Sequence, residues 1–483
     1  MIAGLKPYAE MRDSELPWLG DVPAHWKIMR AKTLLRRVDV RSSAGTEELL
    51  TVSSERGVVP RRTAKVTMFQ AESYAGHKLC WPDDLVINSL WAWGKGLGVS
   101  QHHGIVSTAY GVYRAWKGGE VVPRYLHELV RSSSFHWELQ VRSRGVWISR
   151  LQLTDESFLN APLVVPPADE QAAIVRFLDH ADRRIRRAIG AKQKLIKLLG
   201  EQKQAIIHHA VTRGLDPAVR LKPSGVEWLG DVPEHWNLRR LKALVHRVDQ
   251  GVSPQAENQL ADETSWGVLK AGCVNRGVFR QHEHKRLPLG YRIDESLRVS
   301  EGDVLVSRAS GSPALVGSTG RVASIDFKLI LSDKTFRLVL KDDVNPDFMA
   351  LVMNGRYYRV QVEQAISGAE GLANNLPVSS LRSFLFAIPE RVEQAAIVES
   401  LQVDLRRIDA AIDHGEREIT LLREYRTRLI ADVVTGKLDV REAAARLPGA
   451  VESTDSALDA ELLDEGEISS DEIVASEAED AEA

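Results

Sequence analysis

Apolar residues recur on a seven-residue period in two long segments of this chain. The later segment carries two such series, three residues apart: Val398, Leu405, Ile412, Ile419 and Val433, then Leu401, Ile408, Leu422 and Leu429. The earlier segment has a similar series: Val175, Leu178, Ile185, Ile189, Ile196, Leu199 and Ile206. Asp182, Lys192 and Lys203 interrupt it. This spacing forms the seam of a coiled coil, so each segment predicts a long helix that packs on another helix.

The flanking residues indicate where these helices begin and end. Pro166-Pro167 and Pro389 stand just before the two segments, and Gly214 and Gly436 stand just after them. Proline favours the first turn of a helix, and glycine favours the position after its end. A helix of about 40 residues, rising ~1.5 Å per residue, has a length of roughly 60 Å. We expect the two helices to pair antiparallel; two independent helical hairpins inside ordinary domains are the alternative.

Two blocks of sequence are repeated. The hexapeptide Trp-Leu-Gly-Asp-Val-Pro occupies Trp18–Pro23 and again Trp228–Pro233, and His-Trp follows each copy. A second block, Glu-Gln-Ala-Ala-Ile-Val, spans Glu170–Val175 and Glu393–Val398. The first block repeats after 210 residues and the second after 223, so the stretches between the blocks differ in length. The chain is therefore a pseudo-dimer whose halves share a frame but differ within it.

Short apolar runs occupy the stretches between the blocks. Leu85–Ser89 and Val304–Arg308 predict strands next to turns, and Pro123 and Pro346 each open a predicted helix. The chain thus predicts an α+β fold, with two globular domains joined by two long antiparallel coiled-coil helices in a pseudo-twofold repeat. The predicted boundaries are 1–165 for the first globular domain, 166–216 for the first helix, 217–388 for the second globular domain, 389–440 for the second helix and 441–483 for an acidic disordered tail.

Charge is divided unevenly along the chain. The formal net charge is −3, but residues 445–483 hold thirteen Asp and Glu and one basic residue, Arg446. The preceding 444 residues therefore carry a net charge of +9. A basic folded part favours a partner that carries phosphates, although a solvated surface of mixed charge gives the same sum. The acidic segment is poor in aromatic residues, which predicts disorder.

The cellular compartment can be inferred from what the sequence contains. Two cysteines, Cys80 and Cys273, are too few for a disulfide framework and favour a reducing environment. No apolar run approaches the roughly 18 residues of a membrane span. The N-terminal residues lack the continuous apolar stretch of a signal peptide. These features predict a soluble cytoplasmic protein.

The chain lacks the motifs of common catalytic sites. Gly311–Thr319 resembles a phosphate-binding loop but has the wrong spacing and no lysine, and Gly94–Gly98 does not have the dinucleotide-binding spacing. His282 and His284 lack a further metal ligand. Asp83-Asp84 has no suitably spaced acidic-x-Lys partner for a nuclease site. We therefore expect a binding protein with no catalytic residue, no metal and no cofactor of its own.

Base recognition needs forked or bidentate side chains such as Arg, Asn and Gln on protruding loops. The candidates in the first globular domain are Arg56, Arg61, Arg62, Lys95, Gln101, Arg142 and Arg144. Those in the second are Lys270, Asn275, Arg276, Arg280, Arg308, Asn374 and Asn375. Each can instead be a solvated surface residue or a turn former. Trp91 and Trp93 alternate as on a strand, which favours core packing over base contact.

Together these features resemble the specificity subunit of Type I restriction–modification systems. The resemblance covers residues 14–440 and rests on the two repeated blocks, on Asp84–Trp93 with Gly104–Ser107 in the first globular domain, and on Gly302–Ser312 in the second. It implies two target-recognition domains, each of which reads one half of a split, asymmetric DNA sequence. The helices would set the unread gap. The acidic tail lies outside the resemblance.

The resemblance also implies partners. Subunits of this family have no catalytic residues, and they dock modification subunits and restriction subunits. Modification subunits, of which we expect two, methylate adenine N6 with S-adenosylmethionine, and restriction subunits hydrolyse ATP with Mg²⁺. The expected partner-binding residues lie in the repeated blocks: Trp18, His25, Trp26, Glu170, Gln171, Trp228, His235, Trp236, Glu393 and Gln394. The alternatives are a stand-alone DNA-binding adaptor or regulator, and a coiled-coil scaffold that does not bind DNA.

Overall fold

The computed structural model describes residues 5–64, 73–116, 118–145, 151–366 and 374–448. The chain forms two compact units. The first unit combines Met1–Lys194 with Gly415–Ala483, and the second is Leu195–His414. The first unit is thus built from both ends of the chain and the second from its middle. The boundary crosses both long helices, so each unit contains a part of each helix.

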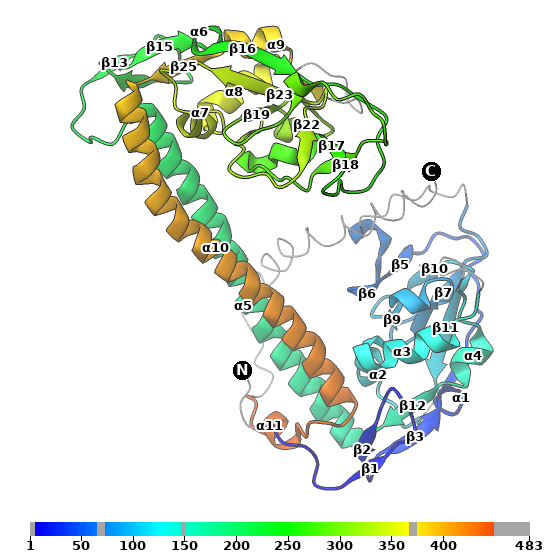
Figure 1. The fold of residues 1–483 in the computed structure, drawn as a ribbon. Coiled ribbons are helices and arrows are strands. Elements are labelled where there is room, and N and C mark those ends of the chain that lie inside the picture. The colour runs from blue at the N-terminus through cyan, green and yellow to red at the C-terminus, as the bar shows by residue number, and fades with distance from the viewer. Residues whose placement is uncertain (1–4, 65–72, 117, 146–150, 367–373, 449–483) are drawn as a thin grey trace. The chain divides into compact units, whose positions relative to one another are not determined.

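The two long helices are α5, Ala168–Arg213, and α10, Arg391–Val434 (Figure 1). Each begins directly after the proline region that predicted its start. Gly214 and Gly436 follow their ends with φ of +74° and +78°, the left-handed conformation that commonly terminates helices. The predicted pair of long helices is therefore confirmed.

Charged residues that interrupt the seam of α5 are paired with charged residues of α10. The pairs are Asp182 with Arg426 and Lys192 with Glu418 in the first unit, and Lys203 with Asp409 in the second. Within the first unit the residue number rises from 182 to 192 on α5, while the number of the partner on α10 falls from 426 to 418. The helices are therefore antiparallel, as predicted. The Lys192–Glu418 distance is 2.6 Å and the Lys203–Asp409 distance is 2.5 Å. Polar pairs in an apolar seam fix its register, because any shift leaves charges facing apolar side chains.

Each unit contains a four-stranded antiparallel sheet, and the two sheets have equivalent strand orders. The order in the first unit is β4 (Leu35–Arg37), β11 (Tyr110–Ala115), β8 (Leu85–Asn88) and β9 (Leu97–Val99). The order in the second is β16 (Val245–Gln250), β23 (Thr335–Leu340), β19 (Val304–Ser307) and β21 (Thr319–Arg321). The inner strands β8 and β19 are buried almost throughout, which explains their unbroken apolar runs. Both strand predictions are confirmed.

Helices pack against each sheet and complete its core. These helices are α2 (Pro123–Arg131) and α3 (Ser133–Arg142) in the first unit, and α7 (Pro346–Val352) and α8 (Arg356–Ala365) in the second. Pro123 and Pro346 stand at the first helical position, as predicted. Buried side chains such as Phe135 and Phe348 join these helices to the apolar faces of α5 and α10. Burying one such side chain contributes about 1.5–3 kcal/mol.

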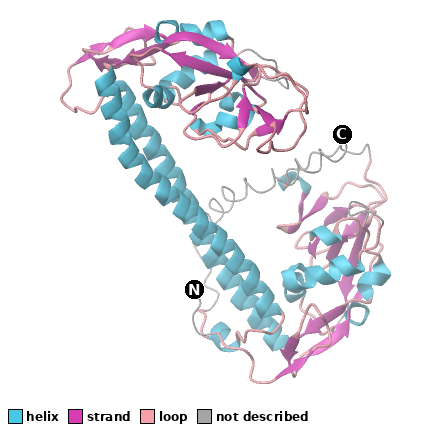
Figure 2. Ribbon diagram, viewed as in Figure 1, coloured by secondary structure: helices cyan, strands magenta, loops and turns pink. Residues whose placement is uncertain are grey.

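The strands outside these sheets differ between the units (Figure 2). The first unit has the hairpin β5 (Leu50–Ser53) and β6 (Gly57–Pro60), and the pair β7 (Lys78–Cys80) and β10 (Gly104–Val106). The second has the mixed sheet β18 (His284–Arg286), β17 (Trp266–Leu269) and β22 (Lys328–Ile330), and the pair β20 (Ala309–Ser310) and β24 (Asn374–Asn375). We call these the peripheral strands. The units therefore share a central sheet and differ in what surrounds it.

Smaller elements complete both units. Equivalent strand pairs are β1 (Met11–Asp13) with β2 (Asp21–Pro23), β13 (Leu221–Pro223) with β14 (Asp231–Pro233), β3 (Lys27–Arg30) with β12 (Pro162–Val165), and β15 (Asn237–Arg240) with β25 (Leu385–Ile388). Short helices are α1 (Ala31–Leu34), α4 (Asp155–Leu159), α6 (Leu241–Leu244), α9 (Val378–Ser383) and α11 (Arg441–Ala445). Turns of 3-10 helix are η1 (Arg61–Thr63), η2 (Ala92–Gly94), η4 (Ala271–Gly277), η5 (Glu295–Leu297) and η6 (Pro313–Leu315).

Trp91 and Trp93 do not lie on a strand. They belong to the turn around η2, and Lys95 follows with φ of +63°. Trp91 packs so closely on this turn that a Cβ added at Gly94 would lie 2.3 Å from its Nε1. The strand prediction is wrong here because two glycines, Gly94 and Gly96, let the chain fold back on the Trp91 ring.

The predicted disordered tail begins later than expected. Residues 441–448 include α11, whose Ala444 is buried. Arg176 on α5 donates to the carbonyls of Leu447 and Pro448 at 2.6 and 3.2 Å. The prediction of disorder is therefore wrong for 441–448, and the rest of the tail, 449–483, lies outside the described residues. In the described part of the chain no helix is long and apolar enough to span a membrane.

Candidate nucleic-acid interface

The glutamate near the start of α5 accepts hydrogen bonds from several parts of the first unit. Its Oε2 accepts from the Trp26 indole at 2.9 Å and from the Tyr8 hydroxyl at 3.1 Å, and its Oε1 lies 2.6 Å from His25 Nε2 and 3.3 Å from Arg441 Nη1. We call Tyr8, His25, Trp26, Glu170 and Arg441 the first clamp. Burial first, and the Glu170 carboxylate second, raise the pKa of Tyr8 well above its ordinary value.

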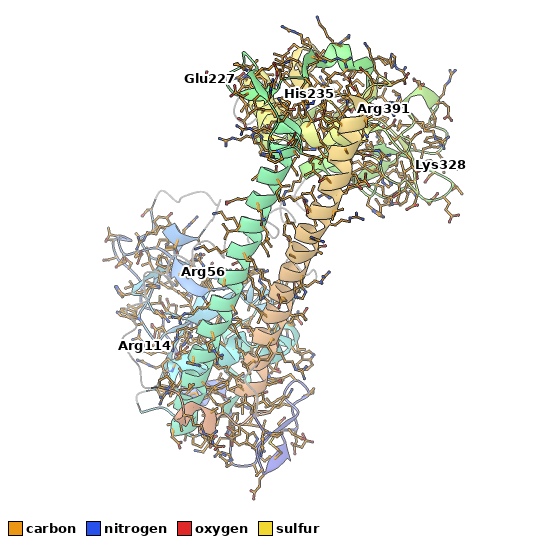
Figure 3. All side chains as sticks on the ribbon, turned by 90° about the vertical axis from the view of Figure 1, so that its left-hand side faces the viewer. Arg56, Arg114, Glu227, His235, Lys328 and Arg391 are labelled. Atoms are coloured by element: carbon orange, nitrogen blue, oxygen red, sulfur yellow. The ribbon has the colours of Figure 1, made fainter. Side chains whose placement is uncertain are left out.

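The second unit repeats this arrangement with fewer contacts. Glu393 Oε1 accepts from the Trp236 indole at 3.0 Å, and its Oε2 lies 2.8 Å from His235 Nε2. His235 lies beside the start of α10 at Arg391 (Figure 3). We call His235, Trp236 and Glu393 the second clamp. Each clamp places a carboxylate in the first turn of a long helix, where the helix dipole favours negative charge.

The glutamine that follows each clamp glutamate makes three equivalent hydrogen bonds. Gln171 accepts from the Val122 amide at 2.7 Å and donates to the Glu120 and Pro166 carbonyls at 2.7 and 2.8 Å. The second unit has the same bonds at 2.7, 3.0 and 2.9 Å, made by Gln394 with Asn345, Asp343 and Pro389. Every residue of the second set lies 223 positions after its counterpart. The clamps, these glutamines, the central sheets and the long helices make up what we call the frame.

These contacts change the role expected for the repeated blocks. Trp26 and Trp236 are 1% and 0% exposed, and both frame glutamines are fully buried. Trp18 and Trp228 are half-buried and pack on aromatic rings inside their own units. The burial of Trp26, Trp236 and the two glutamines gives these side chains a role inside the frame. Partner binding by the half-buried Trp18 and Trp228 and by the other residues of the blocks stays a prediction. His25 and His235 keep about half of their side-chain surface exposed.

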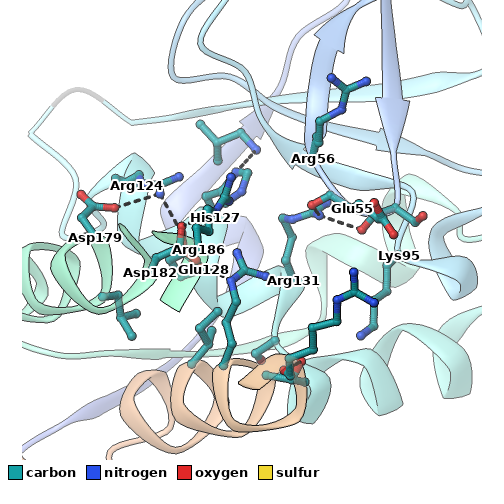
Figure 4. A pocket seen from close by; sticks show the side chains of 18 of the residues that line it. Glu55, Arg56, Lys95, Arg124, His127, Glu128, Arg131, Asp179, Asp182 and Arg186 are labelled. Carbon is teal, nitrogen blue, oxygen red and sulfur yellow. Dashed lines mark hydrogen bonds and ion pairs between the residues drawn. The ribbon is translucent and has the colours of Figure 1, made fainter. Parts of the chain in front are cut away.

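The first unit contains a cleft of about 700 Å³ between its globular part and its part of the helix pair. Three predicted DNA-binding residues line it: Arg56, Lys95 and Gln101. Further basic residues around the same space are Arg124, Arg131 and Arg186 (Figure 4), and Arg423 and Arg426 from α10. The carboxylates of the lining are Glu55, Glu128, Asp179 and Asp182. Cationic groups therefore outnumber anionic ones in this cleft.

Ion pairs inside the cleft leave part of its positive charge uncompensated. The pairs are Arg124 with Glu128 and Asp179, and Asp182 with Arg186 and Arg426. No carboxylate or carbonyl of the described residues pairs with the Lys95 ammonium or the Arg423 guanidinium. Burial first, and the nearby Arg131 second, lower the pKa of Lys95. The cleft thus offers two unpaired cations to an anionic ligand.

Arg131 on α2 fixes the turn that carries Arg56. Its guanidinium donates at 2.6–3.3 Å to four backbone carbonyls, those of Ser53, Ser54, Glu55 and Leu97. Burial lowers the pKa of Arg131 to about 10. These bonds tie the β5–β6 turn to α2 and β9, so the position of Arg56 is set by the frame and not by the turn alone.

His127, on the same helix, accepts a hydrogen bond from the backbone of β9. Its Nδ1 lies 3.1 Å from the Val99 amide nitrogen, so the ring is neutral at this atom. Burial first, and then the cations Arg131 and Arg124, lower the pKa of His127 to about 3. Burial raises the pKa of the neighbouring Glu128, against the effect of Arg124. The floor of the cleft therefore depends on an uncharged histidine.

The other candidates of the first unit lie outside the cleft, and they are Arg61, Arg62, Arg142 and Arg144. Arg62 pairs with Glu48 at 2.8 Å. Arg142 pairs with the buried Glu138 on its own helix, which gives it a structural role. Arg144, just beyond α3, is exposed. The structure thus separates the seven predicted residues into three at the cleft and four elsewhere.

The candidates of the second unit fall into two neighbouring groups. Lys270, Asn275, Arg276 and Arg280 lie on η4 or next to it, and Arg308, Asn374 and Asn375 lie on or beside the strand pair β20–β24. Because η4 packs against β20, the structure brings these groups together.

Local contacts stiffen both groups. Arg280 donates to the Asn275 carbonyl at 2.7 Å, and Arg276 is exposed with φ of +58°, a conformation that side-chain-bearing residues rarely adopt. Arg308 donates to the Asp333 carbonyl at 2.9 Å and lies over the Phe336 ring, which places it against the central sheet. Arg276 is thus better placed than Arg308 to reach a ligand.

Asp84, the second residue of the acidic pair at 83–84, has a structural role. Asp84 is buried and receives two 2.7 Å hydrogen bonds from Arg114, which also lies over the Trp81 ring. The equivalent Asp303 contacts Arg337 at 3.4 Å in the second unit. Among the described residues no group of three or more His, Cys, Asp or Glu is arranged to hold a metal.

Several functional positions were missed by reasoning from sequence. Arg131 and its counterpart in role, Arg359 on α8, anchor turns through backbone carbonyls. The available signal for the first was the i, i+4, i+7 spacing of Arg124, Glu128 and Arg131 on one face of α2. Tyr8 and Arg441 had no signal, because neither belongs to a repeated block.

Comparison with known proteins finds relatives of one kind. No family model matches the chain. Three Type I restriction enzyme specificity subunits are similar: EcoEI of Escherichia coli, 29% identical over 174 residues; StySPI of Salmonella potsdam, 24% over 212; and EcoKI of Escherichia coli strain K12, 20% over 368. The matches cover 36%, 43% and 74% of this chain and 29%, 44% and 75% of those subunits. The chain thus matches less than half the length of the first two relatives.

One solved structure shows the same fold. A chain from a structure described as the basis of complex assembly and conformational transition of the type I R-M system matches 86% of this chain and 99% of its own length, with a TM-score of 0.63 and 16% identity. The HsdS subunit of Thermoanaerobacter tengcongensis covers 86% of this chain and 98% of its own, with a TM-score of 0.46 and 17% identity. Sequence and fold together confirm the resemblance found above: this chain is similar to the specificity subunits of Type I restriction–modification systems.

Proposed function

We propose that this chain is the DNA sequence-recognition subunit of a Type I restriction–modification complex, and that each unit reads one half of a bipartite, asymmetric site. One observation carries the proposal. The frame is duplicated down to individual hydrogen bonds, while the peripheral strands differ between the units. The differing parts carry Arg56 in the β5–β6 turn of the first unit and Asn374 and Asn375 on β24 of the second. A duplicated scaffold with different loops suits two readers of different base sequences.

The cleft of the first unit and the η4 region of the second are the proposed contact regions. Lys95, Arg56 and Gln101 would meet DNA in the first unit, and Arg276, Asn275 and Arg280 in the second. Arginine and lysine attract phosphates without regard to sequence, whereas arginine, asparagine and glutamine can also pair with base edges in the major groove.

The proposed complex contains further subunits. Two modification subunits would bind this chain and methylate adenine N6 with S-adenosylmethionine, and restriction subunits would supply ATP- and Mg²⁺-dependent cleavage. The chain itself would bind none of these cofactors and would not be catalytic. Because Trp26, Trp236 and the two frame glutamines are buried, modification subunits would contact exposed parts of the frame, such as His25 and His235.

Methylation mapping tests the proposal. The chain is purified with its modification subunits, the complex is given a random DNA library and S-adenosylmethionine, and N6-methyladenine is located by sequencing. We expect methylation within one bipartite motif with an unread gap. Methylation without a common motif, or within a single uninterrupted motif, would contradict the proposal. Arg56→Gln and Arg276→Gln are then tested in separate complexes. Each variant should reduce the sequence selectivity of methylation in a different half of the motif.

A further inference from the structure

The acidic C-terminal segment has no place in the recognition mechanism proposed above. Residues 449–483 hold thirteen Asp and Glu and no Lys or Arg. A chain with this charge is attracted to clustered cations and repelled by DNA.

The described part of the chain ends near the basic cleft. The last described residues, Leu447 and Pro448, are held by Arg176 on α5. The part of α5 that lines the cleft begins at Leu178 and includes Arg186. Ten residues of helix separate Arg176 from Arg186, or about 15 Å. A random-coil chain of the same length as 449–483, 35 residues, has a mean end-to-end span of roughly 30 Å, which exceeds this distance.

A second hollow of about 540 Å³ extends the cleft along α10. It shares Ser133, Arg423 and Thr427 with the cleft, and it adds Arg428 and Lys437. Arg428 and Lys437 both approach Asp432, at 3.4 and 3.9 Å. Glu424 also lines this hollow, so its three basic and two acidic side chains leave it with a small net positive charge.

We propose that the acidic segment 449–483 binds in the cleft of the first unit, with its carboxylates against Lys95 and Arg423, and that DNA must displace it. The second part rests on the proposed function. Carboxylates and phosphates are both anions that accept hydrogen bonds from Lys and Arg, so they compete for the same groups. Because the segment is covalently attached, its effective concentration at the cleft is in the millimolar range.

Carbodiimide cross-linking tests the docking without DNA. The reagent joins a carboxylate to a nearby lysine amine with loss of water, and mass spectrometry of the full-length protein identifies the linked peptides. We expect links between Lys95 and residues 449–483 that disappear in high salt, and at least tenfold fewer links from Lys32, an exposed lysine of the same unit outside the cleft. Equal linking of Lys95 and Lys32, or no link to Lys95, would overturn the docking.

DNA binding by full-length and truncated chains tests the competition. Truncation after Pro448 keeps every described residue, and a segment of unchanged length with all thirteen acids replaced by Asn and Gln is the matched control. We expect both changes to tighten DNA binding by roughly tenfold at low salt, and this gain to fade at high salt. In a chain that carries Lys95→Gln and Arg423→Gln, truncation should produce little gain.

The outcomes separate the two proposals. An undiminished gain on truncation in the Lys95→Gln, Arg423→Gln chain would mean that the segment only repels DNA, which overturns docking in the cleft. If neither the full-length nor the truncated chain binds DNA, alone or with its modification subunits, the proposed function fails. A Lys95 cross-link would then still support the docked segment.

Discussion

The two clamps hold equivalent helix starts with different numbers of contacts. Glu170 is 6% exposed and meets four side chains, whereas Glu393 is 32% exposed and meets two. The extra contacts of the first clamp come from Tyr8 and Arg441, which lie near the two ends of the chain. In the second unit the chain continues from α5 through Gly214, which lies directly against Glu393.

This difference shows how one chain closes two equivalent units. The second unit is continuous at this point, so peptide bonds hold the clamp region together. The first unit must join its N-terminal and C-terminal segments without a covalent link. An antiparallel bridge between Lys6 and Asp439 and the contacts of Tyr8 and Arg441 with Glu170 do so. The noncovalent closure should therefore be the more sensitive to mutation.

Removing the clamp carboxylates gives the largest expected difference. Glu170→Ala leaves the buried Trp26 and Tyr8 donors without an acceptor and should cost about 3 kcal/mol in the first unit. Glu393→Ala should cost about 1 kcal/mol in the second, because the half-exposed His235 can bond to water and only the Trp236 indole loses its acceptor. Native-state hydrogen exchange, read by mass spectrometry on peptides from each unit, measures both losses. Equal losses would contradict the closure argument.

The glycines that end the long helices give a smaller contrast. A Cβ at Gly436 would lie 2.3 Å from Pro23 Cδ, whereas a Cβ at Gly214 would lie 3.2 Å from the flexible Glu393 side chain. Gly436→Ala should therefore cost about 2 kcal/mol and Gly214→Ala about 1 kcal/mol, the latter mainly from the left-handed backbone. Urea unfolding of the two variants checks the order, and a larger loss for Gly214→Ala would refute it.

Protonation of His127 at low pH should lower the free energy of unfolding of the first unit. Its folded pKa of about 3 lies below the ordinary value of about 6.5, so the unfolded chain binds the proton more readily. The stability contributed by neutral His127 is complete above about pH 6.5 and is lost as the pH falls toward 3. His127→Gln should flatten the pH dependence of unfolding in this window, and His103→Gln, an exposed control, should leave it unchanged. A pH profile unaffected by His127→Gln would refute the assignment.

Deleting one heptad from each long helix, at positions that face each other, should have the smallest effect on stability among these changes. It should shorten the unread gap in the DNA sequence. Deleting 192–198 and 412–418 removes Lys192 together with its partner Glu418 and keeps the other two charged pairs. The unread gap should shorten by about 3 base pairs, since seven residues rise about 10 Å. Methylation mapping measures the gap, and an unchanged gap would remove the ruler role from the helices.

The frame was largely predictable from sequence, while the contact regions were not. The repeated blocks and the seven-residue period identify the helices because both signals can be read directly from the order of residues. Asp182, Lys192 and Lys203 appeared only as interruptions, since their partners lie more than 200 residues away. Arg131 acts through backbone carbonyls, so its spacing with Arg124 and Glu128 marks a shared face of α2 but does not identify the turn that it anchors.

Exchange of one globular part tests the central claim most directly. Residues 27–165 are replaced by the equivalent segment of a relative with a different target, and the methylated motif of the reconstituted complex is mapped. A shared frame with independent readers predicts that one half of the motif changes, while the other half and the gap stay the same. A change in both halves would contradict the account.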